Sequence, residues 1–264
     1  MTGTTEVPLP IVDAGPESLF RVGRVRAEGD VVRGSMPVGP WLAGPDGRPM
    51  LGSLGVLVDN VLGYAIIASR PPDHWSVSTE ISLDLLEPLP LDGSTVHASA
   101  HVIHADATGG FAVGEVIGDD GRLLATCRQR GRFVRSGPDP QPIAFDLPGD
   151  VADLRRLLGA TRRTDGLDVE VTRVLENPMH NLHGGITLSL TELAAAEALD
   201  DGGPPLVTGS IHVTYVRAVP GGTTLAVDAR VEHRGRSLAS IEVLGRVDGR
   251  TCTIGRVTAQ PATA

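Results

Sequence analysis

The chain has 264 residues, which accommodates two domains of about 100 to 150 residues or one large domain. Its net charge is −9 and its longest basic runs are pairs such as Arg155-Arg156 and Arg162-Arg163, so we expect no nucleic-acid groove. All 23 basic residues are arginine, which excludes Schiff-base chemistry on lysine and a lysine-dependent phosphate loop.

The first half of the chain contains one helix candidate followed by alternating strands. Leu54 to Ser69 is apolar at most positions, which is typical of a helix that is buried on nearly every side. Strands are predicted at Glu80 to Pro90 and at Gly93 to His104, and a hairpin turn at Gly121-Arg122 precedes a final strand. The segment from Ser136 to Asp150 is rich in Pro, Gly and Asp, and we predict that it is a linker.

The second half shows the same order of features. Val151 to Gly159 is predicted to be a short helix, Leu167 to Glu176 a strand, and Gly184 to Leu199 a second buried helix. The features after this helix again match the first half: strands at Ser210 to Pro220 and Gly222 to His233, and a hairpin turn at Gly249-Arg250.

Matching features of the two halves lie about 130 residues apart, which predicts a tandem duplication. One long helix near the start of each copy, followed by antiparallel strands, indicates an α+β fold in which a sheet wraps a helix. We expect an N-terminal domain over residues 1–135, a linker over 136–150 and a C-terminal domain over 151–264.

The two cysteines, Cys127 and Cys252, lie in strand-like segments and have no CxxC spacing, so we expect buried free thiols. The first residues lack a basic region followed by an apolar core, and no stretch of about 18 apolar residues occurs. We therefore expect a cytoplasmic protein without a membrane segment.

The loop before the second helix carries the most specific pattern. It reads NPMHNLHGG from Asn177 to Gly185, and Glu192 lies on the helix that follows. Because the helix begins near the paired glycines, the Gly184 amide belongs to the unpaired N–H groups of a helix N-terminus. Fixed N–H donors of this kind stabilise a developing oxyanion by roughly 3–4 kcal/mol each in other enzymes, so a thioester carbonyl could be polarised there.

This pattern resembles that of the hot-dog acyl-CoA thioesterase superfamily, in particular the phenylacetic-acid-degradation type. That family has Asn, five residues, His-Gly-Gly, and an Asp or Glu nine residues after the His; Asn177, His183 and Glu192 keep both spacings. Some members carry a serine eighteen residues after the carboxylate, where this chain has Ser210. The resemblance covers most of Leu167 to Ala259 and implies a tandem double hot-dog fold, each half a long helix wrapped by an antiparallel sheet.

The first copy keeps only part of the family pattern. It retains the acidic residue on the helix, Asp59, but Gly44 and Met50 occupy the positions of the family's Asn and His. The triplet that corresponds to His-Gly-Gly reads Met50-Leu51-Gly52. The first copy has therefore lost its carbonyl-binding half.

In the family, the carboxylate comes from one domain and the Asn, His and Gly amide come from its partner. The resemblance thus implies two different sites between the halves. One is complete and combines four residues, Asp59, Asn177, His183 and Gly184. The other combines Glu192 with Gly44 and Met50, and is expected to be inactive or reduced to acyl binding.

Asp59 is the first candidate for the catalytic carboxylate and Glu192 the second. The carboxylate would act as a general base for water or as a nucleophile that forms a mixed anhydride, and the sequence leaves both routes open. His183 and Asn177 would orient the thioester oxygen or the attacking water. Thr79, expected just before the strand that follows the first helix, would help to position that water.

Gly185, Ser210 and Arg217 are candidates for substrate binding. Arg217, like Arg234 and Arg236, sits at a strand end of the half that supplies the helix N-terminus, where a guanidinium could bind the phosphates of coenzyme A. Unliganded surface arginines and an ordinary strand serine are the alternatives, just as His183, Asp59 and Glu192 could have structural roles. The His and acidic residues show no metal-ligand spacing such as HxxxH, so we expect neither a metal nor a cofactor.

The function predicted from these features is hydrolysis of an acyl-CoA thioester to free acid and coenzyme A. The alternatives are a non-catalytic protein that binds acyl-CoA or another acyl ligand, a hot-dog hydratase or dehydratase, and an interaction domain. A binding protein would have lost the carboxylate or the His-Gly-Gly, and the composite site keeps both. A fused pair satisfies the minimal hot-dog dimer within one chain, and the sequence leaves open whether two chains form a homodimer.

Overall fold

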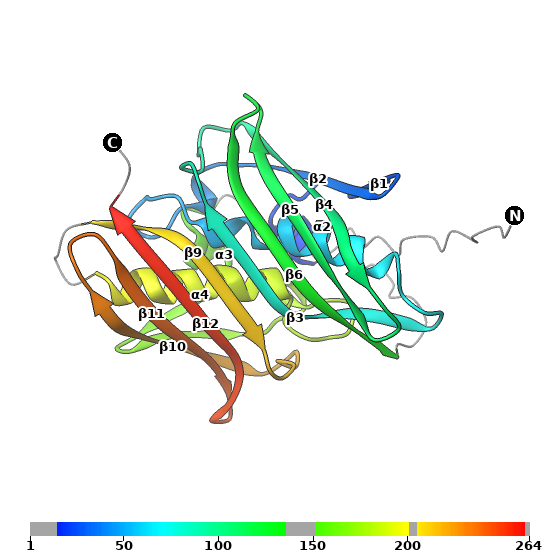
Figure 1. Cartoon of the computed structure of the whole chain (residues 1–264). Coiled ribbons are helices and arrows are strands. Elements are labelled where there is room, and N and C mark those ends of the chain that lie inside the picture. Colours follow the sequence, from blue (N-terminus) through cyan, green and yellow to red (C-terminus); the bar gives the residue numbers. More distant parts are fainter. Residues whose placement is uncertain (1–14, 136–150, 201–204, 262–264) are drawn as a thin grey trace, which may run out of the picture.

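The computed structural model describes residues 15–135, 151–200 and 205–261 (Figure 1). The predicted linker, residues 136–150, lies outside them. The described helices and 3-10 turns are α1 (Pro16–Leu19), η1 (Pro40–Leu42), η2 (Leu51–Leu54), α2 (Gly55–Ile67), α3 (Leu154–Leu157), η3 (Arg173–Leu175) and α4 (Gly184–Ala198). The strands are β1 (Arg26–Glu28), β2 (Val31–Pro37), β3 (His74–Leu85), β4 (Thr95–Ala105), β5 (Gly109–Gly118), β6 (Leu123–Arg135), β7 (Thr161–Arg163), β8 (Gly166–Glu170), β9 (Leu206–Tyr215), β10 (Thr224–Arg234), β11 (Ala239–Val247) and β12 (Arg250–Pro261).

The strands form one continuous antiparallel sheet in the order β1-β2-β4-β5-β6-β3-β9-β12-β11-β10-β8-β7. Counted from the outer edge of the sheet inward, each half contributes its strands in the same order. The two halves meet in the middle, where β3 pairs with β9. In that ladder Glu80 lies opposite Thr214, and Asp84 lies opposite Ser210. The duplication read from the sequence is therefore also a duplication in space, and backbone hydrogen bonds join the halves.

The two long helices lie on the same side of the sheet, α2 against the strands of the first half and α4 against those of the second (Figure 1). All residues of α2 except Gly63 are buried, as the apolar pattern predicted. The helices also contact each other. The expected arrangement, a sheet wrapped around a buried helix in each half, is confirmed.

The N-terminal ends of α2 and α4 approach each other at two glycines, Gly55 and Gly185. A Cβ atom on Gly185 would overlap the backbone of Gly55, and a Cβ atom on Gly55 would overlap the carbonyl oxygen of Gly185. Glycine is therefore required by the close approach of one helix backbone to the other.

The predicted bounds of three strands differ from the structure by several residues. β3 and β9 both begin and end earlier than expected, at His74–Leu85 and Leu206–Tyr215, and β8 ends at Glu170. The apolar residues after β8 had extended the alternating pattern, but they belong to η3, where Leu175 is buried in the core. The short helix predicted near Val151 is confirmed as α3.

Thr79 lies within β3, so its expected position before the strand was wrong. Ser78 pairs with Gly131 and Glu80 with Arg130, which leaves Thr79 as the extra residue of a β-bulge. A bulge breaks the alternation of side chains between the two faces of a strand, and this break hid the first part of β3 in the sequence pattern.

Both cysteines are free and buried, as predicted. Burial raises the pKa of the Cys127 thiol to about 12, so this side chain is an unreactive thiol at neutral pH. Among the described helices, none is long and apolar enough to cross a membrane.

Candidate active site

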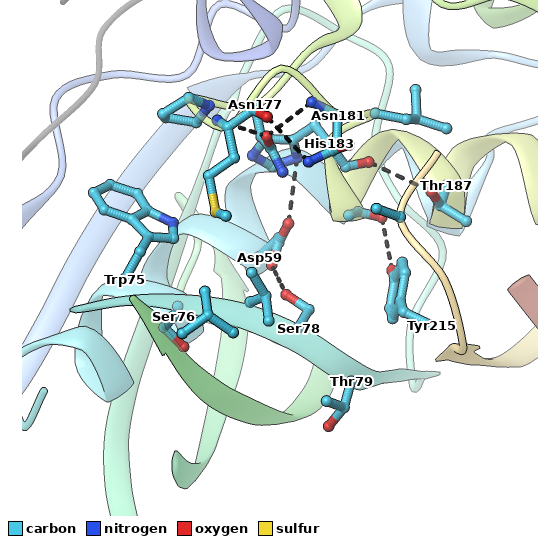
Figure 2. Close-up of a pocket in the computed structure, with 18 of the residues that line it drawn as sticks. Asp59, Trp75, Ser76, Ser78, Thr79, Asn177, Asn181, His183, Thr187 and Tyr215 are labelled. Carbon is cyan, nitrogen blue, oxygen red and sulfur yellow. Dashed lines mark hydrogen bonds and ion pairs between the residues drawn. The ribbon is translucent and has the colours of Figure 1, made fainter. Parts of the chain in front are cut away.

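A cavity of about 410 Å³ opens where the two halves meet. Its walls come from α2 and β3 of the first half and from the loop before α4 and the end of β9 of the second. The four residues expected to form the complete site all line this cavity: Asp59, Asn177, His183 and Gly184 (Figure 2). The structure therefore brings together, across the junction, residues that lie more than a hundred positions apart in the chain.

Asp59 projects from α2 and its carboxylate is held from two sides. Its Oδ1 accepts a hydrogen bond from the Ser78 hydroxyl at 2.9 Å (Figure 2), and its Oδ2 accepts one from the Gly185 N–H at 3.0 Å. The Ser78 oxygen in turn accepts a hydrogen bond from the amide nitrogen of Gln129 at 2.9 Å. These donors fix the orientation of a charged acceptor in a buried place.

His183 is the N-cap residue of α4 and lies beside Asp59. Its Nδ1 accepts the Gly185 N–H at 3.0 Å and is 3.3 Å from the Asp59 Oδ2. Because Nδ1 accepts this hydrogen bond, the neutral ring carries its hydrogen on Nε2. That nitrogen is 3.8 Å from Oε1 of Glu17, so the imidazole lies between two carboxyl groups.

Glu17 was missed in the sequence. It lies on α1, ahead of the first element recognised there, and its side chain is buried and lines the cavity. Burial raises its pKa above the ordinary value, and the neighbouring His183 opposes this rise. The repeat offered no signal, because the corresponding short helix of the second half, α3, has arginines there.

Gly184 is the first residue of α4, so its N–H belongs to the unpaired first turn of the helix. Its carbonyl oxygen accepts a hydrogen bond from the Tyr215 hydroxyl at 2.7 Å. Burial raises the pKa of Tyr215 well above its ordinary value, so this hydroxyl remains a donor at neutral pH. A Cβ atom on Gly184 would lie 2.6 Å from the Asp59 Oδ2, so glycine is required at this position.

Asn177 lines the cavity, but its side-chain oxygen is used within its own loop. It accepts the Met179 N–H at 2.9 Å and the Asn181 N–H at 3.2 Å. These bonds form a compact turn just before His183 and so fix the path of the chain into that residue. The geometry thus supports a role for Asn177 in shaping the loop rather than in direct contact through this oxygen.

The other candidates are distributed more widely. Thr79 lines the cavity, but its hydroxyl donates to the Arg130 carbonyl at 3.0 Å and lies apart from Asp59 in Figure 2. Thr79 was expected to help position the attacking water, and it is its neighbour Ser78 that contacts the Asp59 carboxylate. Arg217 is exposed at the cavity and donates to the Thr251 carbonyl at 2.6 Å.

Ser210 does not line this cavity, because its hydroxyl lies 2.7 Å from that of Thr258 on the neighbouring strand. The family spacing, counted from Glu192, leads to Ser210 and gives no indication of Ser78. The reason is that the connection between helix and strand differs in length between the two halves. The repeat itself offered a better signal: Ser78 lies 130 positions before Thr208, which hydrogen-bonds the corresponding carboxyl group of Glu192.

A second cavity, of about 340 Å³, contains Glu192 together with Gly44 and Met50. The Glu192 oxygens accept the N–H groups of Leu51 at 3.0 Å and Gly52 at 2.5 Å. Burial nevertheless raises the pKa of Glu192 to about 7. The residues of the predicted second composite site are thus assembled in space, with a methionine where the first site has a histidine.

Two family models match the chain. Residues 22–133 match the acyl-CoA thioesterase C-terminal domain, and residues 179–254 match the thioesterase superfamily. Together these matches cover more than half of the sequence. The chain belongs to the thioesterase superfamily. No curated protein sequence matches it.

Solved structures of thioesterases share the fold of this superfamily member over most of its length. The tesB protein of Mycobacterium avium subspecies paratuberculosis has a TM-score of 0.67 at 13 % identity, with 95 % of this chain and 100 % of that chain covered. A 12:0-ACP thioesterase from Umbellularia californica has a TM-score of 0.62 at 13 % identity, covering 90 % and 100 %. An acyl-ACP thioesterase from Bacteroides thetaiotaomicron has a TM-score of 0.58 at 14 % identity, covering 88 % and 98 %. The hot-dog fold and the thioesterase class, both predicted from the sequence, are confirmed.

Proposed function

We propose that this thioesterase hydrolyses an acyl-CoA, releasing free acid and coenzyme A, at the one cavity in which Asp59 meets His183 and the N-terminus of α4. The observation that carries the proposal is the shared Gly185 N–H, which reaches both the Asp59 carboxylate and the His183 ring. It places an oriented carboxylate next to a helix N-terminus that can stabilise an oxyanion.

The carbonyl oxygen of the thioester is proposed to face the Gly184 N–H, which lies in the unpaired first turn of α4. Asp59 then acts in one of two ways. As a base it takes a proton from water, the hydroxide adds to the carbonyl carbon, the C–S bond breaks, and the sulfur leaves with the electron pair and is protonated. As a nucleophile it displaces the thiolate to form a mixed anhydride, which water then hydrolyses.

The surrounding residues support either route by holding Asp59 and His183 in place. Ser78 and Gln129 form a hydrogen-bonded chain to one carboxylate oxygen. Glu17 faces the far nitrogen of His183 and favours the tautomer in which Nδ1 is free to accept. A site held by packed strands and helices keeps the reacting groups in one geometry, which is the main requirement for a fast thioester hydrolase.

The cavity also offers both parts of an acyl-CoA a suitable surface. Apolar side chains for the acyl group line it: Tyr64, Ile67, Trp75, Val134 and Met179. Arg135 and Arg217 are exposed on the same cavity and carry the positive charge that phosphates of coenzyme A require. The cytoplasmic location and a homodimer of the double hot-dog chain remain predictions.

The proposal is tested by measuring thiol release from a panel of acyl-CoA esters with the purified protein. Both cysteines of the chain are buried, so a thiol reagent reports coenzyme A with little background. We expect the wild type to release thiol and His183→Ala to lose most of this activity while still binding a non-hydrolysable acyl-CoA thioether. If the wild type binds the thioether but releases no thiol from any ester, the chain is an acyl-binding protein instead.

A further inference from the structure

The cavity around Glu192 is the structural equivalent of the candidate active site. Glu192 projects from α4 and meets the turn before α2, just as Asp59 projects from α2 and meets the turn before α4. Apolar residues from both halves line this second cavity: Met50, Ala195, Leu206, Val257 and Ala259. At about 340 Å³ it is only slightly smaller than the active-site cavity.

The groups that would perform chemistry are replaced in this cavity. Met50 stands where the other site has His183, and it offers no proton acceptor. Both Glu192 oxygens accept backbone N–H groups, of Leu51 and Gly52, and Thr208 adds a further hydrogen bond. These three donors hold the Glu192 carboxyl group against the protein and no histidine lies beside it, so hydrolysis is not expected here.

The charged residue that the short helix contributes also differs between the two cavities. The short helix α1 places the acid Glu17 at the active site, whereas the equivalent helix α3 places Arg155 at the second cavity. The Nη1 of Arg155 and the Nε of Arg162 lie 3.3 and 3.2 Å from the two oxygens of a single carboxylate, that of Glu197. One acid thus faces two guanidinium groups at the wall of a cavity that Asp46, Arg48, Asp200 and Arg234 also line.

We propose that this second cavity binds an acyl compound with an anionic head group, without hydrolysing it. The head group is either the carboxylate of a free fatty acid or the phosphates of coenzyme A, and both would lie against Arg155 and Arg162. The choice of an acyl ligand rests on the proposed function of the first site. The apolar residues and the two guanidinium groups of Arg155 and Arg162 in its lining favour such an amphiphile over a neutral lipid or a cation.

Two exposed alanines give a matched pair of blocking variants. Ala196 lies on the second cavity and Ala218 on the active-site cavity, and both side chains are exposed, so tryptophan at either position fills a cavity without overpacking the core. Binding of the dodecyl thioether of coenzyme A, dodecanoic acid and free coenzyme A is then measured by calorimetry on the full chain.

We expect the wild type to bind two equivalents per chain of the thioether, of dodecanoic acid or of both, and Ala196→Trp and Ala218→Trp to bind one each. Arg155→Ala combined with Arg162→Ala should weaken binding at the second cavity at least tenfold. Two equivalents of the acid alone assign the head group to a carboxylate, and two of the thioether alone assign it to coenzyme A. A single equivalent of every probe, or two that Ala196→Trp leaves unchanged, would overturn the proposal.

The same preparations separate this inference from the proposed function. Thiol release by a wild type that binds one equivalent would support the first site and contradict the second. Two bound equivalents without thiol release would support binding at the second site and contradict hydrolysis at the first.

Discussion

The two helix carboxylates, Asp59 and Glu192, show how single substitutions can divide one ancestral arrangement into unlike sites. Asp59 accepts one backbone N–H and a serine hydroxyl, and it contacts a histidine. Glu192 accepts two backbone N–H groups and contacts no histidine, because Met50 occupies that place. The first carboxylate is arranged to meet a substrate, and the second is fixed to the backbone of the opposite half.

Glu192 makes the stability of the protein depend on pH. Its pKa is about 7 in the folded chain, against an ordinary value of 4.5. Between these values the folded chain holds a proton that the unfolded chain has released, so the free energy of unfolding falls as pH rises through this window. The full effect of the shift is about 3 kcal/mol. We expect urea unfolding to show this decline in the wild type and a weaker decline in Glu192→Gln; equal slopes would contradict the assignment.

Glu17 should matter for activity although it does not contact Asp59 by a hydrogen bond. We expect Glu17→Gln to lower kcat on the order of tenfold, with a smaller change in KM, because the His183 ring loses the charge that faces its Nε2. The measurement is the pH profile of kcat, whose shape should change along with its height. Glu28→Gln is the control, since Glu28 is exposed on β1. An unchanged profile in Glu17→Gln would restrict this residue to packing.

At the scale of secondary-structure elements, the contact between the ends of α2 and α4 positions the site. Gly185 donates to Asp59 and also packs against the backbone of Gly55, so the same close approach that joins the helices brings the carboxylate to its partners. The sequence motif predicted substrate binding for Gly185 and no role for Gly55. Their packing role was invisible in one sequence, because it depends on how two distant helices cross.

The helix contact predicts opposite effects for two glycine-to-alanine changes. Gly185→Ala should lower the free energy of unfolding by about 1–3 kcal/mol, because the new methyl group overlaps the backbone of Gly55. Gly63→Ala, in the middle of α2, should be neutral or raise it by up to about 1 kcal/mol, since its nearest neighbour would be the Gln129 amide at 3.6 Å. Equal effects of both changes in urea unfolding would show that the helices do not meet as described.

The sequence predicted the elements whose signals are local, and it missed those whose signals are not. Both long helices and the Gly121-Arg122 hairpin follow from apolar patterning and turn chemistry, and the loop at His183 follows from motif spacing. Thr79 was selected on this strand and Ser78, which contacts Asp59, was missed, because a bulge at Thr79 breaks the alternation of β3. Glu17 had no local signal, since its neighbour His183 reaches it only in the folded chain, where α1 contacts α2 and η3.

At the scale of the whole molecule, the pairing of β3 with β9 makes one sheet of two halves and sets their helices against each other. Neither half contains a complete site. The first supplies Asp59, Ser78 and Glu17, and the second supplies His183 and the N-terminus of α4. Duplication followed by loss of the Asn and His positions in the first copy therefore leaves one cavity with all the groups of the proposed hydrolytic site.

The most direct test of this account compares the two helix carboxylates in one assay. Asp59→Asn and Glu192→Gln each replace a carboxyl group by an amide at equivalent positions, and thiol release from an acyl-CoA is measured beside the folded fraction of each variant. We expect Asp59→Asn to lower kcat by roughly 10²–10⁴-fold, as loss of a catalytic carboxylate does, and Glu192→Gln to keep turnover within about threefold of the wild type. Loss of turnover in Glu192→Gln with retention in Asp59→Asn would contradict the account and place the chemistry in the other cavity.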